Sequence, residues 1–160
     1  MASSPPTKNK KRTQAWYRRR CVDRAKRLCR DIGYCEYCGA KRGTVQLQAS
    51  HVFPEEYHPV CTEPRNLVCL CARCHKFGHN AWHKGPQIPV WFFRTRHKDY
   101  VWLEIMKDGP EPDWKEEYEK TKSAPDSEGA LLVRTEAGIR PRSQWYITRK
   151  RRSIGPPLCD

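Results

Sequence analysis

The chain has 160 residues, of which 38% are hydrophobic and 31% are charged, and its formal net charge at pH 7 is +13. This length is enough for one compact domain with appendages, or for two very small domains. The low hydrophobic fraction predicts a thin core, which favours an additional cross-link such as a bound metal ion. The positive charge favours nucleic acid as a partner, and the lack of a long apolar run argues against a membrane.

The first residues, MASSPPTKNKKRTQAWYRRR, contain no apolar stretch that could serve as a signal peptide, which predicts a cytoplasmic location. Nine cysteines in a reducing compartment indicate metal ligands and thiols in preference to disulfide bonds. Four of the nine form two Cys-x2-Cys pairs. The other five are expected to stay as thiols: Cys21, Cys29, Cys61, Cys69 and Cys159.

Residues 1–12 are rich in Pro, Ser and Lys and are predicted to form a disordered basic arm. From Trp16 to Ile32, apolar side chains recur at helical spacing, and Gly33 is suited to cap this helix. One interpretation is that the helix packs against the core and exposes its charged face to solvent. The other is that its cations contact the phosphates of a nucleic acid, and the two roles are compatible. The cations are Arg18, Arg19, Arg20, Arg24, Lys26, Arg27 and Arg30.

Residues 34–86 hold the strongest motifs, and with the basic helix they are expected to form one core, residues 13–86. Residues 45–53 and 66–71 predict two short strands, and a helix is expected from about residue 72 to just before Gly85. Residues 87–122 predict a helical extension, whose last helix is opened by a capping box of Asp113 and Glu116. Residues 123–160 are predicted to be a linker and a basic arm, with a strand at 144–148.

The two Cys-x2-Cys pairs predict a structural zinc site. Thiolates are the softest ligands in the chain, and four of them complete the tetrahedral shell that zinc prefers in closed sites. A redox role is disfavoured because no βαβ pattern surrounds the pairs. The predicted ligands are Cys35, Cys38, Cys71 and Cys74.

Three histidines follow the last cysteine and are left outside this shell. Adjacent helical residues point about 100° apart, so Cys74 and His75 should face different neighbours. On a continuous helix His75 and His79 share a face, with His83 only slightly displaced, which predicts a second, bidentate metal site.

The order Cys-x2-Cys, His51, Asn66-Leu67, Cys-x2-Cys-His75 and His79 resembles that of the HNH endonucleases, over about residues 15–90. LQASH together with RNLVCLCARCHKFGHNAWHKGP is most similar to the phage NinG (Rap) type, recombination endonucleases that act on branched DNA. The resemblance implies an α+β fold. It comprises a small ββα-metal core cross-linked by the four-cysteine zinc site, with flanking helices and basic terminal arms.

The resemblance also implies a role for each matched residue. His51 would be the general base that deprotonates the attacking water, and Asn66 would fix its orientation by hydrogen bonds across the loop. His75 and His79 would hold a divalent ion at the scissile phosphate. The products would carry a 5′-phosphate and a 3′-hydroxyl.

Ser50 departs from the HNH pattern, because in many of these enzymes the residue before the base is Asp or His and binds the metal. His83, His58 or water is therefore expected in the third position. Imidazole-rich ligation favours Mn²⁺, Ni²⁺ or Zn²⁺ over Mg²⁺.

Two other functions stay open at this point. The first is a zinc-dependent nucleic-acid-binding module without catalysis, which Ser50 favours. The second is a terminase or packaging accessory factor that a partner protein stimulates. DNA is the expected substrate, although the sequence does not distinguish it from RNA. A homodimer would suit symmetric cutting, but no motif demonstrates one.

Overall fold

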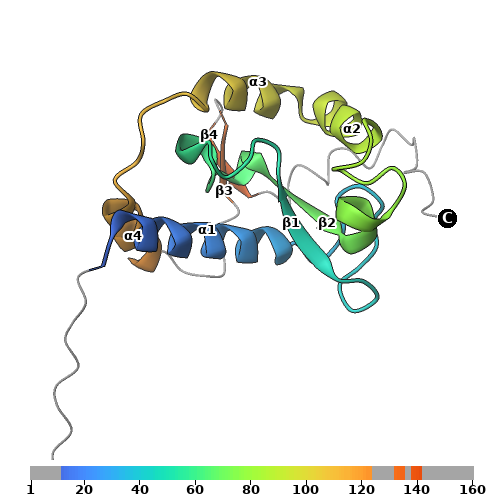
Figure 1. The fold of residues 1–160 in the computed structure, drawn as a ribbon, viewed down its shortest axis with the longest axis horizontal. Helices are drawn as coiled ribbons and strands as arrows, with labels where there is room; N and C mark the ends of the chain where they lie inside the picture. Colours follow the sequence, from blue (N-terminus) through green and yellow to red (C-terminus); the bar gives the residue numbers. More distant parts are fainter. Residues whose placement is uncertain (1–11, 124–131, 136–137, 142–160) are drawn as a thin grey trace, which may run out of the picture.

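The computed structural model describes residues 12–123, 132–135 and 138–141, which form a mixed α+β fold (Figure 1). Its longest helix, α1 (Gln14–Arg30), begins after Thr13, whose side-chain oxygen accepts a hydrogen bond from the Trp16 amide. The helix ends before Gly33, which has φ +83°, a conformation that favours glycine. The predicted basic helix is confirmed within two residues at either end.

Two short strands pair antiparallel beside this helix. Strands β1 (Leu47–His51) and β2 (Leu67–Cys71) align so that His51 lies opposite Leu67 and Leu47 lies opposite Cys71. Every residue of β2 is buried, and α1 contacts both strands. In Figure 1 the strands lie between α1 on one side and α2 and α3 on the other. Strand β2 is therefore the centre of the larger core cluster.

The connection between the strands contains the 3-10 turns η1 (His58–Val60) and η2 (Pro64–Asn66). After β2 the chain makes a single π-helical turn, η3 (Arg73–Phe77). The predicted helix to Gly85 is therefore wrong. The Gly78 amide donates to Arg73 O at 2.8 Å, and a Cβ at Gly78 would lie 2.9 Å from that same oxygen, so the turn requires glycine. Beyond it the chain continues as a loop, closed by the Trp82 amide on Cys74 O at 2.7 Å.

The helical extension consists of α2 (Gln87–Thr95), α3 (His97–Met106) and α4 (Trp114–Ser123). Asp113 Oδ1 accepts the amides of Lys115 and Glu116, which is the Asp113 half of the predicted capping box. Helix α4 packs against α1, and the Trp114 amide donates to Gln14 Oε1 at 3.0 Å. The carboxyl-terminal helix of the extension thus closes onto the first helix of the core.

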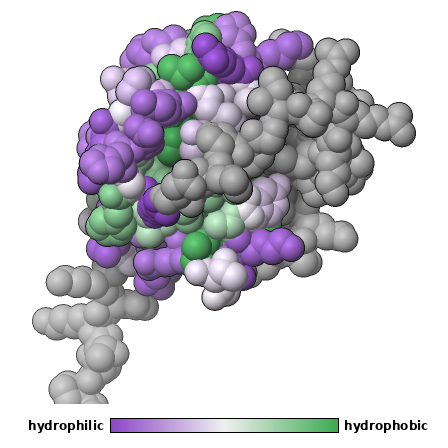
Figure 2. Space-filling model, turned by 90° about the vertical axis from the view of Figure 1, so that its right-hand side faces the viewer, coloured by the Kyte–Doolittle hydropathy of each residue, from purple (hydrophilic) through white to green (hydrophobic). Residues whose placement is uncertain are grey.

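A second antiparallel pair, β3 (Leu132–Thr135) and β4 (Gly138–Pro141), lies within the predicted linker and arm. The predicted disordered arm, apart from Arg12, and the predicted strand at 144–148 lie outside the described residues. Among the described helices none combines the length and apolarity needed to cross a membrane. Hydrophilic side chains cover most of the described surface in Figure 2, and the apolar ones form separate patches.

Arg96, at the junction of α2 and α3, connects the helical extension to the core. Its guanidinium donates to Leu67 O at 3.3 Å and to Arg65 O at 3.1 Å, and it lies 3.6 Å from the carboxylate of Glu36. The Glu36 side chain is fully buried and also accepts the Cys69 amide. A buried carboxylate is stable only when it is paired and hydrogen-bonded, so Arg96 keeps Glu36 in place beside β2.

We expect Arg96→Ala to lower the free energy of unfolding by about 3–5 kcal/mol, because it leaves the Glu36 carboxylate buried without its cation. Urea unfolding at a fixed zinc concentration measures the change. The exposed Arg94, in the same segment, provides the control. Arg94→Ala should change stability by less than about 0.5 kcal/mol. Equal effects of the two substitutions would contradict this role for Arg96.

Candidate metal centre and histidine site

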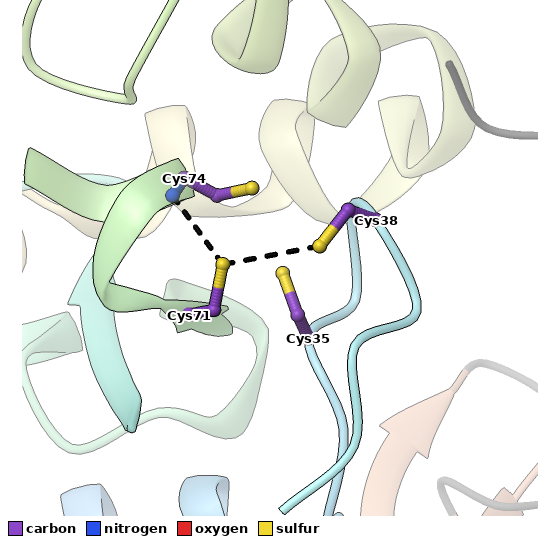
Figure 3. A group of neighbouring side chains, drawn as sticks. All are labelled: Cys35, Cys38, Cys71 and Cys74. Carbon is purple, nitrogen blue, oxygen red and sulfur yellow. Dashed lines mark hydrogen bonds between the residues drawn. The ribbon is translucent and has the colours of Figure 1, made fainter. Parts of the chain in front are cut away.

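Four cysteines from three segments come together at one end of the β1–β2 pair (Figure 3). Cys35 and Cys38 lie in the loop after α1, Cys71 ends β2, and Cys74 lies in η3. Their sulfur atoms all lie within 4.8 Å of one another. This group could hold a metal ion such as zinc. Among the described residues, these are the only three or more Cys, His, Asp or Glu side chains whose ligand atoms converge in this way.

The geometry of the sulfur atoms fits a tetrahedral ion. Zn–S bonds of about 2.3 Å define a tetrahedron whose edge is about 3.8 Å. Cys38 Sγ lies 3.8 Å from Cys71 Sγ, and the backbone amide of Cys74 points at Cys71 Sγ at 3.4 Å. Amide hydrogen bonds of this kind stabilise a thiolate.

The loop that carries the first cysteine pair is held by its own backbone and by β2. Gly39, with φ +79°, turns the chain so that its amide reaches Cys35 O and the Cys35 amide reaches Ala40 O. The Glu36 amide donates to Cys69 O at 2.7 Å, and the Glu36 carboxylate accepts the Cys69 amide. The loop is therefore attached to the strand that ends in Cys71.

The electrostatics of the cluster favour a cation. A hydrogen bond from the Cys74 thiol, together with backbone amides, lowers the pKa of Cys35 to about 5, against the opposing effect of burial. The same contact with Cys35 raises the pKa of Cys74, with burial adding to the shift. One thiol of the group ionises readily, and its negative charge opposes ionisation of the next. A bound metal ion removes this opposition by neutralising the thiolates.

His75, next to Cys74, faces away from the sulfur cluster and toward β1. Its side chain is largely buried, with Nδ1 2.6 Å from Gln48 Oε1 and Nε2 3.0 Å from Nε2 of His83. Burial, followed by the nearby His83 and Lys76, lowers the pKa of His75 to about 4. The ring is therefore neutral at physiological pH, which is the form that binds a metal ion.

His79 does not share a helical face with His75, contrary to the sequence-based expectation. Because η3 ends at Phe77, His79 lies exposed in the turn that follows, and the ring that contacts His75 belongs to His83. The three histidines do not form a convergent group of ligands in the described structure. His83, which the sequence offered as one option for the third ligand, is the residue that pairs with His75.

His51, the last residue of β1, has a largely buried side chain and one nitrogen occupied by the backbone. Its Nε2 lies 2.9 Å from Cys61 O, and because a carbonyl only accepts, Nε2–H donates. The lone pair is then on Nδ1, which lies 3.8 Å from Oε1 of the half-exposed Glu55. Burial lowers the pKa of His51 below its usual value, while the Cys61 carbonyl opposes the shift. His51 can therefore accept a proton through Nδ1 at neutral pH.

Asn66 is fully buried and holds both ends of the loop that follows His51. Its Oδ1 accepts the Phe53 amide at 2.7 Å, and its Nδ2 donates to Phe53 O at 2.9 Å and to Val60 O at 3.1 Å. The Asn66 carbonyl also accepts the Val52 amide. Asn66 thus connects the residues after His51 to the turn that supplies the Cys61 carbonyl.

Ser50 and His58 occupy different environments. Ser50 Oγ is buried, and among the described residues no hydrogen-bond partner is found for it. His58, one of the expected alternatives for a third metal ligand, contacts the Arg18 guanidinium, and its Nδ1 lies 2.9 Å from Glu111 Oε1. It belongs to the contact between α1 and the chain before α4, and it does not form part of a metal-ligand group among the described residues.

The cations of α1 differ in their exposure. Arg18 and Lys26 turn toward the protein, where Arg18 contacts His58 and Lys26 pairs with Glu55. Arg24 is half-buried. The exposed members are Arg19, Arg20 and Arg27. Three of the six predicted nucleic-acid contacts on this helix are therefore on the outer surface.

Gln48, Glu36 and the Cys61 carbonyl were not anticipated as part of the site. The position of Gln48 could have been found from the sequence, because Gln48 and Ser50 are two residues apart in a predicted strand and therefore lie on the same face. The other two depend on long-range packing.

Comparisons with known proteins assign no family to the chain. No family model, no curated protein and no solved structure matches it. The assignment of a function therefore depends on the residues and their contacts.

We expect one zinc ion per chain, with loss of cooperative folding when Cys35 or Cys74 is replaced by Ser, because zinc binding to such a site is coupled to folding. Elemental analysis and thermal unfolding measure the two quantities. Cys21 is also buried but lies in a separate cluster beside Trp114, so Cys21→Ala should keep its zinc. Zinc-free wild-type protein that still folds cooperatively would contradict the prediction.

Proposed function

We propose that the chain is a metal-dependent HNH endonuclease that hydrolyses phosphodiester bonds in DNA, with a structural zinc ion at the four cysteines. The observation that supports it best is the environment of His51. A neutral imidazole has Nε2 held by a backbone carbonyl and Nδ1 left to accept a proton, and a buried asparagine supports the loop that supplies the carbonyl. A nucleic-acid-binding module has no need of this arrangement.

The order of the elements agrees with the ββα-metal core of the proposed family. Strands β1 and β2 pair antiparallel, and η3 follows β2 directly, as the HNH resemblance requires. The base is at the end of the first strand, and the asparagine immediately precedes the second. The helical element is a short π-turn in this chain, and single π-turns are frequent at functional sites.

In the proposed reaction His51 removes a proton from the attacking water through Nδ1, while the Cys61 carbonyl stabilises the resulting imidazolium through Nε2–H. Asn66 fixes the position of the His51 ring relative to the Cys61 carbonyl by its hydrogen bonds to Phe53 O and Val60 O. The low pKa of His51 keeps the base unprotonated at neutral pH.

His75 and His83 are the proposed ligands of the catalytic divalent ion, in place of His75 and His79. Their Nε2 atoms lie 3.0 Å apart, so both rings could bind the same ion through these nitrogens. When bound, such an ion supplies Lewis-acid stabilisation of the charge on the phosphate and on the leaving oxygen.

The exposed arginines of α1 are proposed to contact DNA phosphates, which gives affinity without sequence recognition. A cytoplasmic, phage-encoded recombination enzyme acting on branched DNA, alone or as a homodimer, is the setting that the NinG resemblance suggests. A phage recombination or packaging protein would then be its partner.

The second candidate is a zinc-dependent nucleic-acid-binding module or a packaging accessory factor with little activity of its own. The observation in its favour is the incomplete ligand set, since Ser50 stands where many HNH enzymes have a metal ligand and His79 does not approach His75. Cleavage restored only by an added partner would identify the accessory factor.

We expect His51→Ala to lower the rate of DNA cleavage by about 10²- to 10⁴-fold, the usual contribution of a positioned general base. Zinc content, melting temperature and DNA affinity should stay near wild type, because His51 belongs neither to the four-cysteine cluster nor to the exposed arginines of α1. The assay uses labelled linear, forked and four-way DNA with a panel of divalent ions and with EDTA as a control.

His97→Ala provides the matched substitution, since His97 is exposed on α3, and it should cleave as wild type does. Equal rates for His51→Ala and wild type would refute the assignment of this site. If no protein cleaves any substrate with any ion, the binding-module function replaces the nuclease.

Replacing Arg19 and Arg27 together with Ala should weaken binding to all DNA sequences equally. The slope of log K against log salt should become shallower by about 0.9 for each phosphate that the variant no longer neutralises. The paired substitution Arg94→Ala with Lys98→Ala removes the same charge from the exposed surfaces of α2 and α3. An identical slope change in both double variants would mean that the contribution of α1 is only its net charge.

A further inference from the structure

Gln48 connects β1 to the buried face of His75 and takes no part in the reaction proposed above. Its Oε1 lies 2.6 Å from His75 Nδ1, the shortest contact that His75 makes with another side chain. His75 is only 8% exposed, so bulk water does not readily replace Gln48 as the hydrogen-bond partner of Nδ1. The contact joins the strand that carries His51 to the π-turn that carries Cys74 and His75.

The contact determines the tautomer of His75. An amide oxygen only accepts hydrogen bonds, so the proton must be on Nδ1 of His75 and the lone pair on Nε2. The neighbouring His83 Nε2, 3.0 Å away, must then carry its own proton and donate it to His75 Nε2. In the metal-free protein the lone pair that a metal would use is therefore occupied by the N–H of His83.

We propose that Gln48 is a positioning residue for the second metal site: its amide oxygen fixes His75 as the Nδ1–H tautomer and directs Nε2 toward His83. The proposal deepens the proposed function and rests on it for the use of the bound ion. A histidine ligand commonly donates its second N–H to a carboxylate, a carbonyl or a water, and loss of that partner costs about 10- to 100-fold in metal affinity.

The two histidines then have different parts in binding an ion. His75 has the correct tautomer before the ion arrives, whereas His83 must move its proton from Nε2 to Nδ1. His83 is exposed, so solvent can carry this proton. His75 and His83 would hold the ion in place of the hydrogen bond between their rings, and no proton would need to leave His75.

The first test is the nitrogen chemical shifts of His75 in full-length, zinc-loaded wild-type protein, measured by NMR without a second metal. The expected result is a proton on Nδ1 of His75 and on Nε2 of His83. A proton on Nε2 of His75 would overturn the proposal, because the Gln48 amide would then face the ring with its NH2 group.

The second test compares two substitutions of Gln48 in the zinc-loaded protein, with Co²⁺ as the probe ion and absorbance or calorimetry as the readout. Gln48→Leu removes the acceptor, and we expect its Co²⁺ affinity to fall about 10- to 100-fold and the Nδ1–H tautomer to be lost. Gln48→Glu keeps an acceptor and should retain both. Gln46→Leu, two residues earlier at an exposed position, should bind Co²⁺ as wild type does.

Controls distinguish an effect on Co²⁺ binding from effects on folding and on nuclease activity. Each variant is checked for one zinc per chain and for cooperative unfolding, and Gln48→Glu tests the proposal even if Gln48→Leu does not fold. Unchanged Co²⁺ affinity in Gln48→Leu, or an affinity in Gln48→Glu as low as that in Gln48→Leu, would overturn it. The protein could show the expected tautomer and Co²⁺ affinities and still fail to cleave DNA. That result would refute the proposed nuclease function but would not affect the role of Gln48.

Discussion

Four thiol groups held within 4.8 Å of one another cannot all ionise unless a cation lies between them. The rest of the structure depends on this constraint, because the cysteines come from the loop after α1, the end of β2 and the π-turn η3. A metal ion bound at this point would connect the three segments. The residue after Cys74, His75, is directed toward β1 by its contact with Gln48.

A second, metal-independent connection runs alongside the first. Glu36, in the first cysteine loop, bonds to the backbone of β2 and pairs with Arg96 between α2 and α3. Arg96 in turn holds the carbonyls of Leu67 and Arg65, on either side of Asn66. The asparagine that supports the loop after His51 therefore lies between two backbone positions fixed from the helical extension. The predicted helical extension is therefore part of the support of the site.

Much of the architecture could be predicted from local patterns. The period of apolar residues identifies α1, and the two short strands follow from alternation and from the cysteines that end them. The sulfur cluster follows from two Cys-x2-Cys pairs, because this spacing suits one ion. The length of η3 could not be read in the same way, since histidines at helical spacing suggested a helix while Gly78 ends it after Phe77.

The contacts that define the candidate site were harder to predict than its residues. His51 and Asn66 could be found by their order along the chain, but the carbonyl that holds His51 belongs to Cys61, and no side-chain pattern marks a backbone acceptor. The pairing of His75 with His83 depends on the loop after Gly78, whose path is set by the bond from the Trp82 amide to Cys74 O. Such information lies in tertiary packing and not in residue type.

The peptide bond between Cys74 and His75 has a practical consequence for enzymology. One turn of chain carries a sulfur ligand of the first ion and a nitrogen ligand of the proposed second ion. A chelator or thiol oxidant that removed a metal ion from the cysteines would also free the segment that aims the imidazole at β1. For the proposed nuclease, inhibition by EDTA would therefore report on both ions, and an excess of Mn²⁺ or Mg²⁺ would restore activity only while the cysteines kept their own metal.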